Sequence, residues 1–257
     1  MVIQSIKRAF DIIEVLSENP YGVTLTTLSE LVGLHISTTH RILNSLRELR
    51  YAEQSSDRTW KPGAGLVGLS SKLLLKDDLL PAALSPVDRL WKKSNETVHL
   101  AILHGAETYD VIAKESPCQV RCSARIGQRM PLHATALGKV LLAYQQGNRL
   151  ESLLKSLDLT KHTQDTITDL DYLKSHLKEI REKGYAINYS EYSESAVAMA
   201  APVMNFRGDV VAALGIGIPT SRFDKADLQD IVGLVIKEAG QISKNLGYFT
   251  PERAAEF

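Results

Sequence analysis

The chain has 257 residues, of which 44% are hydrophobic and 23% charged, and its 30 basic and 30 acidic side chains cancel to a net charge of zero. This composition is typical of one or two folded domains. It excludes a disordered chain and argues against a protein that coats nucleic acid through bulk positive charge. No apolar run approaches the ~18 residues of a membrane span, and the amino terminus lacks the layout of a signal peptide, so we expect a cytoplasmic protein without membrane contact.

Three helices are predicted near the amino terminus. The first spans 5–18, the second spans 25–32 with Thr24 as its N-cap, and the third begins near Ser37; in each, apolar side chains recur at helical spacing. Gly33 can take the left-handed backbone conformation that a tight corner requires. The arrangement is typical of a helix-turn-helix, although any small helical corner has the same spacing.

The third helix begins with short or polar side chains. Its free backbone N–H groups and positive dipole end suit phosphate, and short hydroxyl side chains can reach base edges. The candidate DNA-contacting residues are Ser37, Thr38, Thr39, His40 and Arg41.

A hairpin is predicted directly after the third helix. Residues 50–54 and 59–61 read as short strands around a turn at 55–58. A hairpin in this position is the wing of a winged helix, so Arg58 and Lys61 are candidates for contacts with the DNA backbone or minor groove. An exposed tip that only improves solubility explains Arg58 equally well.

A further helix is expected over about 66–76, and residues 77–81 look like a domain boundary. The leucine-rich stripe of this helix has more apolar surface than an isolated linker should expose. We therefore expect it to contact a second subunit.

The rest of the chain mixes helices and strands. Helices are expected at 82–94, within 130–144, and at 148–156, 169–183 and 224–246; strands are expected at 98–103, 108–113, 120–126, 185–189, 196–204 and 210–218. Antiparallel strands with helices grouped at the ends indicate an α+β sensor-like domain rather than a doubly wound parallel one.

Metal binding and nucleophilic catalysis are poorly supported. Cys118 and Cys122 are too few for a disulfide scaffold, and with His99, His104 and His133 they match no established zinc or Cys-His spacing. A buried cysteine and surface histidines are the favoured reading. There is also no P-loop and no Gly-rich dinucleotide turn after a strand. We expect no metal, no cofactor and no enzymatic activity.

Three separated segments resemble the IclR family of bacterial transcription regulators. They are the winged helix-turn-helix of residues 5–61, the segment 127–143 with PLHATALGKVLLA, and the segment 184–217. The resemblance extends over about residues 3–247. It implies an α+β protein that binds DNA and a small effector as a homodimer or homotetramer on palindromic promoter sites.

The resemblance also implies a division of the chain. The implied parts are a winged helix-turn-helix domain at 1–62, a linker helix at 63–80, a GAF-like effector-binding domain at 81–250 and a tail at 251–257.

The family's DNA-contacting positions fall on residues 37–41, which were also singled out above. Ile36 stands where members commonly have Lys or Pro, and Thr39 stands where an apolar residue is common. Ser5, Lys7 and Arg8, at the start of the first helix, are candidates for DNA-backbone contacts, with a structural role equally open.

The positions that line the family's effector cavity correspond to Cys122, Met130, Ala136, Leu137, Asn188, Ala196, Ala198, Gly215 and Gly217. Members that bind small oxo-acids tend to carry Cys or Ser where this chain has Ala198, Gly215 and Gly217, so a roomier and less polar cavity is expected. Backbone N–H groups near Ala136 and Leu137 suit a carboxylate. Asn188 can bond a hydroxyl or carbonyl.

Core packing is the favoured role for Met130, Leu137 and Ala196, and a structural role is favoured for Glu191. The resemblance thus predicts a transcriptional regulator controlled by a small organic acid, a catabolic substrate or intermediate, with an aromatic or bulkier acid favoured. The alternative is a GAF-like binding or enzymatic module whose amino-terminal helices serve only dimerisation.

Overall fold

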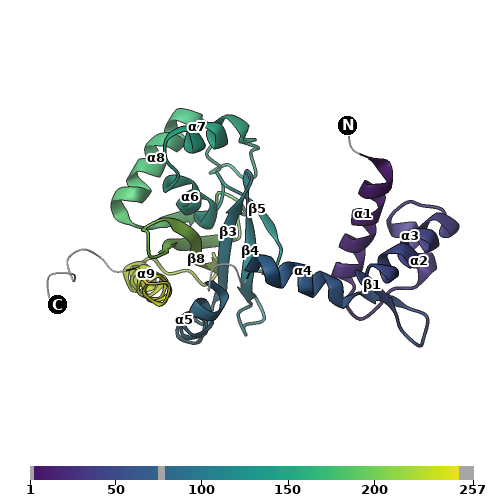
Figure 1. Cartoon of the computed structure of the whole chain (residues 1–257). Helices are drawn as coiled ribbons and strands as arrows, with labels where there is room; N and C mark the ends of the chain where they lie inside the picture. The colour runs from purple at the N-terminus through teal and green to yellow at the C-terminus, as the bar shows by residue number, and fades with distance from the viewer. Residues whose placement is uncertain (1–2, 75–78, 249–257) are drawn as a thin grey trace. The chain divides into compact units, whose positions relative to one another are not determined.

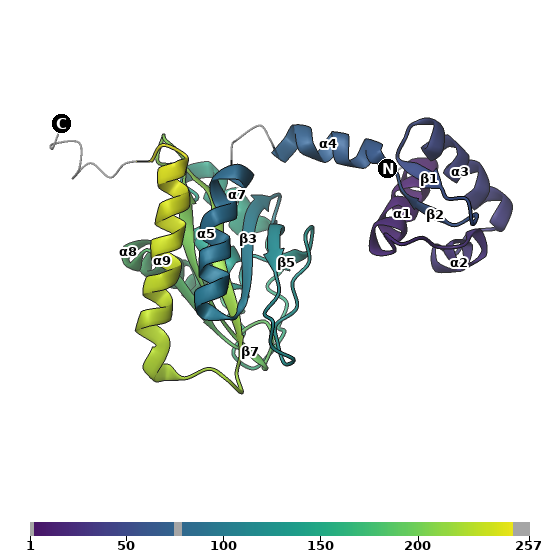
Figure 2. The same ribbon diagram turned by 90° about the horizontal axis from the view of Figure 1, so that it is seen from below.

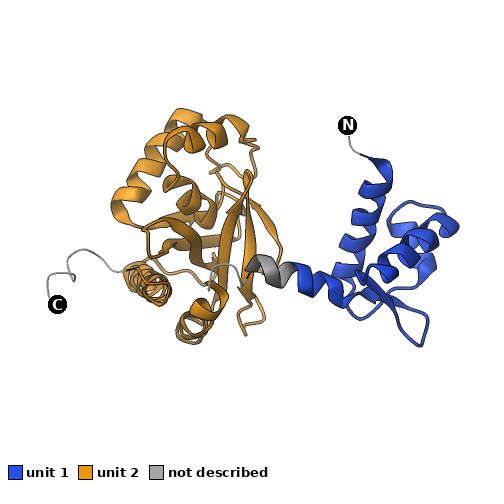
Figure 3. Cartoon of the chain, viewed as in Figure 1, with its two compact units in different colours: residues 1–77 blue, residues 78–257 orange. Residues whose placement is uncertain are grey.

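The computed structural model describes residues 3–74 and 79–248, and the chain divides into two compact units, Met1–Asp77 and Asp78–Phe257 (Figure 3). Residues 75–76 of the expected linker helix, 77–78 of the expected boundary and the expected tail at 251–257 lie outside the described residues. Within the described ranges, no helix is both long and apolar enough to cross a membrane.

The first unit combines three packed helices with a two-stranded hairpin (Figure 1). Its elements are α1 (Gln4–Glu18), α2 (Leu25–Leu31), α3 (Ile36–Glu48), β1 (Ala52–Gln54), β2 (Trp60–Pro62) and α4 (Ala64–Leu74). Ile12, Leu16, Leu28, Leu43 and Trp60 are fully buried at its centre. The apolar faces of the three helices therefore meet one another and the hairpin, as in a winged helix-turn-helix.

Caps and a glycine set the corner between α2 and α3. The Thr24 hydroxyl accepts a hydrogen bond from the N–H of Thr27 at 3.2 Å, which confirms Thr24 as the N-cap. Gly33 adopts a φ of 63°, in the left-handed region. His35 caps α3, because its Nδ1 accepts from the N–H of Ser37 at 3.3 Å. The helix therefore starts at Ile36, one residue before the expected position.

The hairpin after α3 is short and anchored at its base. Gln54 lies opposite Trp60 in the antiparallel pair, and Val23 adds an isolated β-bridge to Trp60. At the tip, the Asp57 carboxylate accepts from the N–H of Thr59 at 3.0 Å, and Arg58 has a φ of 65°.

The second unit is built on a six-stranded antiparallel sheet with the order β5-β4-β3-β8-β7-β6. Its strands are β3 (Thr97–His104), β4 (Glu107–Lys114), β5 (Arg129–Pro131), β6 (Ala186–Tyr189), β7 (Ala196–Met204) and β8 (Val210–Pro219). Its helices are α5 (Leu79–Ser94), α6 (Ala136–Ala143), α7 (Gly147–Ser156), α8 (Leu170–Lys183) and α9 (Leu228–Asn245), with a short 3-10 turn, η1 (Lys225–Asp227).

The two faces of this sheet are covered by different helices. Figure 2 shows α5 and α9 side by side on one face, and Figure 1 shows α6 and α8 on the other. Large strand residues such as Leu100, Leu214 and Ile216 join the core under α5 and α9, whereas Ala101 and Ala213 join the core under α6. The alternation of side chains along the strands therefore places large side chains on the face under α5 and α9 and small side chains on the face under α6.

One strand prediction for this unit is wrong, and one short strand was not predicted. The strand expected at 120–126 is an irregular loop, because its carbonyls are bonded by side chains instead of a neighbouring strand: Thr97 donates to the Cys122 carbonyl at 2.6 Å, and Arg222 donates to that of Val120 at 3.1 Å. The helix expected within 130–144 is α6, which starts at Ala136, and the short edge strand β5 at 129–131 was not predicted.

Candidate functional site

The first candidate site is the exposed start of α3. Ser37, His40 and Arg41 are exposed and Thr38 is half-buried, so four of the five predicted side chains lie at or near the surface. A helix start with accessible N–H groups and a cationic side chain within its first turns is suited to a phosphate backbone and to base edges.

Thr39 does not belong to this surface. It is fully buried, and its hydroxyl donates to the carbonyl of His35 at 3.3 Å. Its helical phase explains the burial, because Leu43 and Leu46 lie four and seven residues further along the same face and are also buried. The prediction that Thr39 contacts DNA is therefore wrong.

The hairpin lies against α3 through Trp60. The His40 ring meets the Trp60 ring edge-on at 6.4 Å between centroids, and the Arg47 guanidinium lies 5.8 Å from its centroid. Arg47 and Trp60 were not singled out from the sequence, although an exposed arginine two turns along a recognition helix is a recognisable signal. Trp60 holds the wing in a fixed place beside the helix.

The remaining candidates for DNA contact are spread over the wing and α1. Arg58 is exposed at the hairpin tip, Lys61 is half-buried in β2, and Ser5 is exposed in the first turn of α1. Arg8 is half-buried, with its Nε enclosed and without a hydrogen-bond partner among the described residues.

The second candidate site is a cavity of about 520 Å³ in the second unit. All nine positions singled out from the resemblance line it: Cys122, Met130, Ala136, Leu137, Asn188, Ala196, Ala198, Gly215 and Gly217. They come from the loop before β5, from β5, from the start of α6, and from strands β6, β7 and β8. Met130, Leu137 and Ala196, for which core packing was favoured, are half-buried in its wall. The fold brings together residues up to 95 positions apart (122 to 217).

Two glycines, Gly215 and Gly217, form the floor of this cavity because they have no side chains to fill it. A Cβ on Gly215 would lie 2.6 Å from the Met199 carbonyl oxygen, and one on Gly217 would lie 3.3 Å from Cys122 Sγ. On the cavity side, β7 therefore carries alanine at 196 and 198, and β8 carries glycine at 215 and 217. The volume suits a ligand larger than a two- or three-carbon acid.

The start of α6 forms one end of the cavity. The Thr135 hydroxyl caps the helix by accepting from the N–H of Gly138 at 3.1 Å. The N–H groups of Ala136 and Leu137, in the first turn, have no acceptor within the helix. They and the helix dipole favour a negative group at this end.

Asn188 is held firmly between two backbone groups. Its side-chain amide donates to the Ala134 carbonyl, and its Oδ1 accepts from the N–H of Glu191 at 2.9 Å. One N–H and one lone pair remain for a ligand. Asn188 thus both fixes the entry to α6 and faces the cavity.

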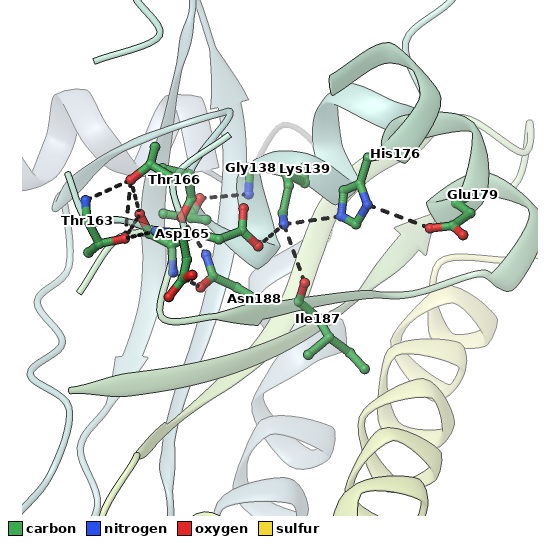
Figure 4. A network of polar contacts seen from close by, with 12 residues as sticks. Gly138, Lys139, Thr163, Asp165, Thr166, His176, Glu179, Ile187 and Asn188 are labelled. Carbon is green, nitrogen blue, oxygen red and sulfur yellow. Dashed lines mark hydrogen bonds and ion pairs between the residues drawn. The ribbon is translucent and has the colours of Figure 1, made fainter. Parts of the chain in front are cut away.

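A buried charge pair supports this wall from behind (Figure 4). Lys139 is fully buried, and its three N–H groups point to Glu191, to His176 Nε2 at 3.3 Å and to the Ile187 carbonyl at 3.4 Å. Burial lowers the pKa of Lys139 and raises that of Glu191, and their mutual attraction opposes both shifts. Glu191 has the structural role predicted for it.

The loop at 163–166 is attached to the same pair. The Thr166 hydroxyl donates to the Glu191 carbonyl at 2.6 Å and the Thr163 hydroxyl at 3.3 Å (Figure 4). These bonds connect α6, the segment after β6 and the loop before α8. Together the three segments support the cavity wall.

The reading of all three histidines as surface residues is wrong for two of them. His133 is buried, its Nε2 lies 3.0 Å from the Thr160 carbonyl oxygen, and burial lowers its pKa. His99 is half-buried in the cavity wall, where its Nδ1 lies 2.8 Å from Asp110 Oδ2. Only His104 is exposed. His99 lies on the same face of β3 as the buried Ala101, so the alternation of side chains along this strand indicates that His99 faces the core.

Cys122 lines this wall with a neutral thiol. Burial raises the pKa of Cys122 to about 11, so its thiol stays protonated at neutral pH and is a poor nucleophile. Among the described residues, no group of three or more His, Cys, Asp or Glu side chains could hold a metal ion.

Comparison with known proteins gives the family. Residues 5–56 match the family described as the IclR helix-turn-helix domain, and residues 71–244 match the one described as bacterial transcriptional regulator IclR C-terminal. The chain belongs to the IclR family. Its first unit is thus an IclR helix-turn-helix domain, and its second is the GAF-like IclR effector domain that contains the cavity, in agreement with the predicted α+β fold class.

Individual IclR proteins resemble the chain over nearly its whole length. The HTH-type transcriptional regulator XynR of Escherichia coli is 32% identical over 96% of this chain and 98% of its own length. The Thermotoga maritima IclR structure superposes with a TM-score of 0.79 at 27% identity, over 95% of this chain and 99% of that one. These relatives are transcriptional regulators, not enzymes.

A third relative was solved with a ligand. An IclR homolog from Microbacterium hydrocarbonoxydans, complexed with 4-hydroxybenzoate, superposes with a TM-score of 0.80 at 23% identity, over 95% of this chain and 99% of that one. At this identity the likeness supports the shared fold alone.

Proposed function

We propose that this IclR-type regulator binds palindromic promoter sites as a homodimer or homotetramer in the cytoplasm, and that a small organic acid controls its binding. The acid would be a substrate or intermediate of the catabolic pathway whose genes it regulates. The observation that carries the proposal is the cavity, because all nine positions at which an effector was expected line one space, with a helix start at one end.

In this proposal the start of α3 reads the DNA. Ser37, Thr38, His40 and Arg41 enter the major groove, with Arg41 as the main cationic contact. Contacts with the DNA backbone or minor groove come from Arg58, Lys61, Ser5 and Arg8. Thr39 is left out because it is buried.

Paired copies are needed for tight binding. The chain has no net charge, so one copy gains little from bulk attraction to DNA. Two recognition helices about 34 Å apart reach successive major grooves on one side of a duplex. The amino-terminal domain at 1–62, the linker helix at 63–80 and the effector domain at 81–250 are the parts through which the spacing is set.

The effector is an organic acid larger than three carbons. A carboxylate at the N–H groups of Ala136 and Leu137 gains from the helix dipole, and the apolar floor accepts a ring or chain. The cavity of about 520 Å³ has room for an acid of the size of 4-hydroxybenzoate, the ligand of the Microbacterium homolog.

Control works by a population shift. An acid that binds one arrangement of the effector domains more tightly than another changes the spacing of the recognition helices by favouring that arrangement. The acid then changes the affinity for DNA by the same factor by which DNA changes the affinity for the acid.

Sequence-preferring DNA binding tests the proposal. The purified full-length protein is titrated, at about 150 mM salt, into a labelled fragment from the promoter region beside its own gene, with a scrambled fragment of equal length as control. The proposal predicts at least about 1,000-fold preference for the promoter fragment. Equal binding of both fragments, with and without candidate acids, would instead support a module whose helices only dimerise it.

A further inference from the structure

The cavity contains a histidine whose second ring nitrogen has no protein partner. His99 Nδ1 lies 2.8 Å from Asp110 Oδ2, and no hydrogen bond to His99 Nε2 occurs among the described residues. An ideal Cβ on Gly217 would lie 3.9 Å from that Nε2. The nitrogen therefore borders the space left by the missing side chain of Gly217.

A β-bulge puts Asp110 behind His99. The register between β3 and β4 shifts between Leu100 and Ala101, so that Ala101 lies opposite Asp110, with Val111 as the extra residue. Without the shift, Asp110 would lie on the other face of the sheet. The bulge instead places it on the face of His99, where its side chain is fully buried.

The buried carboxylate fixes what His99 offers to a ligand. A carboxylate only accepts hydrogen bonds, so the hydrogen between the two side chains is on Nδ1. In the neutral ring, Nε2 then carries a lone pair directed into the cavity and accepts from a hydroxyl group.

The two ends of the cavity are separated along β8. A Cβ on Gly215 would lie 3.1 Å from Leu137 Cδ2, at the α6 end, whereas one on Gly217 would lie 3.9 Å from His99 Nε2, because the His99 ring reaches diagonally from its register partner Gly215 toward Gly217. Two residues of an extended strand span ~7 Å. A two- or three-carbon acid is shorter than this, whereas a para-substituted ring or a chain of about six bonds matches it.

We propose that the effector is a hydroxy acid that spans the cavity, with its carboxylate at the start of α6 and a distal hydroxyl donating to His99 Nε2. This assignment rests on the proposed function, which supplies the acid, and it makes His99 the residue that selects the hydroxylated ligand. Asp110 acts as a positioning residue, because it touches His99 and not the ligand.

Matched acids that differ by one hydroxyl test the assignment. The probes are 4-hydroxybenzoate against benzoate and 6-hydroxyhexanoate against hexanoate, with affinities for the full-length protein measured by calorimetry. At least one hydroxylated acid should bind about tenfold more tightly than its partner, as one well-formed hydrogen bond predicts.

The variant His99→Phe keeps a ring and removes the acceptor. It should bring the affinity ratio of that pair close to one while leaving the affinity of the acid without the hydroxyl within about twofold. The control His104→Phe, at an exposed position of the same strand, should keep the wild-type ratio. An unchanged ratio in His99→Phe, or an equal loss for both acids, overturns the assignment.

A second measurement needs no variant, because His99→Phe leaves the buried Asp110 carboxylate without its partner, which can prevent folding. The ¹⁵N resonances of the histidine rings in the wild-type protein should show one Nε2 that shifts with the hydroxylated acid and not with its partner. No such shift overturns the assignment. If none of the four acids binds while promoter binding persists, the acid part of the proposed function fails too; if all bind without preference, only this assignment fails.

Discussion

The side-chain amine of Lys139 donates to the carboxylate of Glu191 inside the effector domain, and this pair joins α6 to the segment that follows β6 (Figure 4). Lys139 is fully buried, and all of its N–H groups point to acceptors. The pair lies behind Asn188, whose Oδ1 accepts from the N–H of Glu191. The cavity wall therefore depends on a buried ionic contact.

Breaking this pair should be costly, and replacing both members should be less so. Lys139→Met leaves a buried carboxylate without its partner and is expected to lower the free energy of unfolding by about 3–5 kcal/mol, whereas the double variant Lys139→Met/Glu191→Leu should recover most of that loss. Urea unfolding at pH 7 measures both. Exposed Lys174→Met is the control, with a change within about 0.5 kcal/mol. A double variant as unstable as the single one contradicts the role of the pair.

Acid should destabilise the protein through His176. Burial, with the charge of Lys139, lowers the pKa of His176 from 6.5 to about 4. Between these values the unfolded chain binds the proton and the folded chain does not, so stability falls as the pH drops from about 6.5 to about 4. The full effect of this one group is about 3 kcal/mol.

The variant His176→Gln isolates this contribution. It keeps an acceptor for Lys139 and removes the titrating ring. The free energy of unfolding, measured between pH 4 and 7, should vary less with pH in the variant than in the wild type; His133, whose pKa is lowered in the same direction, supplies part of the remaining slope. Parallel curves for the two proteins would show that His176 does not titrate as described.

Arg41 should matter for DNA and not for folding. It is exposed on α3, so Arg41→Ala is expected to weaken promoter binding about tenfold, with a melting temperature within about one degree of wild type. Fluorescence anisotropy and a thermal melt give the two values. Lys174→Ala, exposed in the other unit, is the matched control. A variant that melts several degrees lower would place Arg41 in the fold.

Gly217 should control the volume available to the ligand. Gly217→Ala puts a methyl group 3.3 Å from Cys122 Sγ, in the space beside His99, and should weaken acid binding at least about tenfold while promoter binding persists. Gly233→Ala, in α9 where a Cβ meets nothing within 4 Å, is the control and should leave acid binding unchanged. Unaltered acid affinity in Gly217→Ala would place the ligand elsewhere.

Much of the architecture was predictable because it rests on local periodicity. Helical spacing predicted α1, α2 and α3, and apolar runs separated by turn residues predicted β3, β7 and β8. The burial of Thr39 was also readable, since Leu43 and Leu46 share its helix face. The prediction of a DNA contact fails at Thr39 because a hydroxyl at a helix start suits DNA as well as it suits a hydrogen bond to the carbonyl one turn earlier.

Other features depend on contacts between residues far apart in the sequence, which no local pattern predicts. The pairing of His99 with Asp110 requires a bulge in β4, and the loop at 120–126 is held by Arg222, about a hundred residues away. The buried position of Lys139 depends on acceptors from β6 and α8. The nine cavity positions were identified through the family resemblance, because spacing alone does not bring 122, 137 and 217 together.

The central claim is that acid binding and DNA binding are coupled, and reciprocal titration measures this directly. The affinity of the full-length protein for its promoter fragment is determined with and without a saturating acid, and the affinity for the acid is determined with and without the fragment. The account predicts that both affinities change by the same factor, between about 5-fold and 150-fold, and that Gly217→Ala abolishes the effect of the acid at the same concentration. An acid that binds the cavity and leaves promoter affinity unchanged would contradict it.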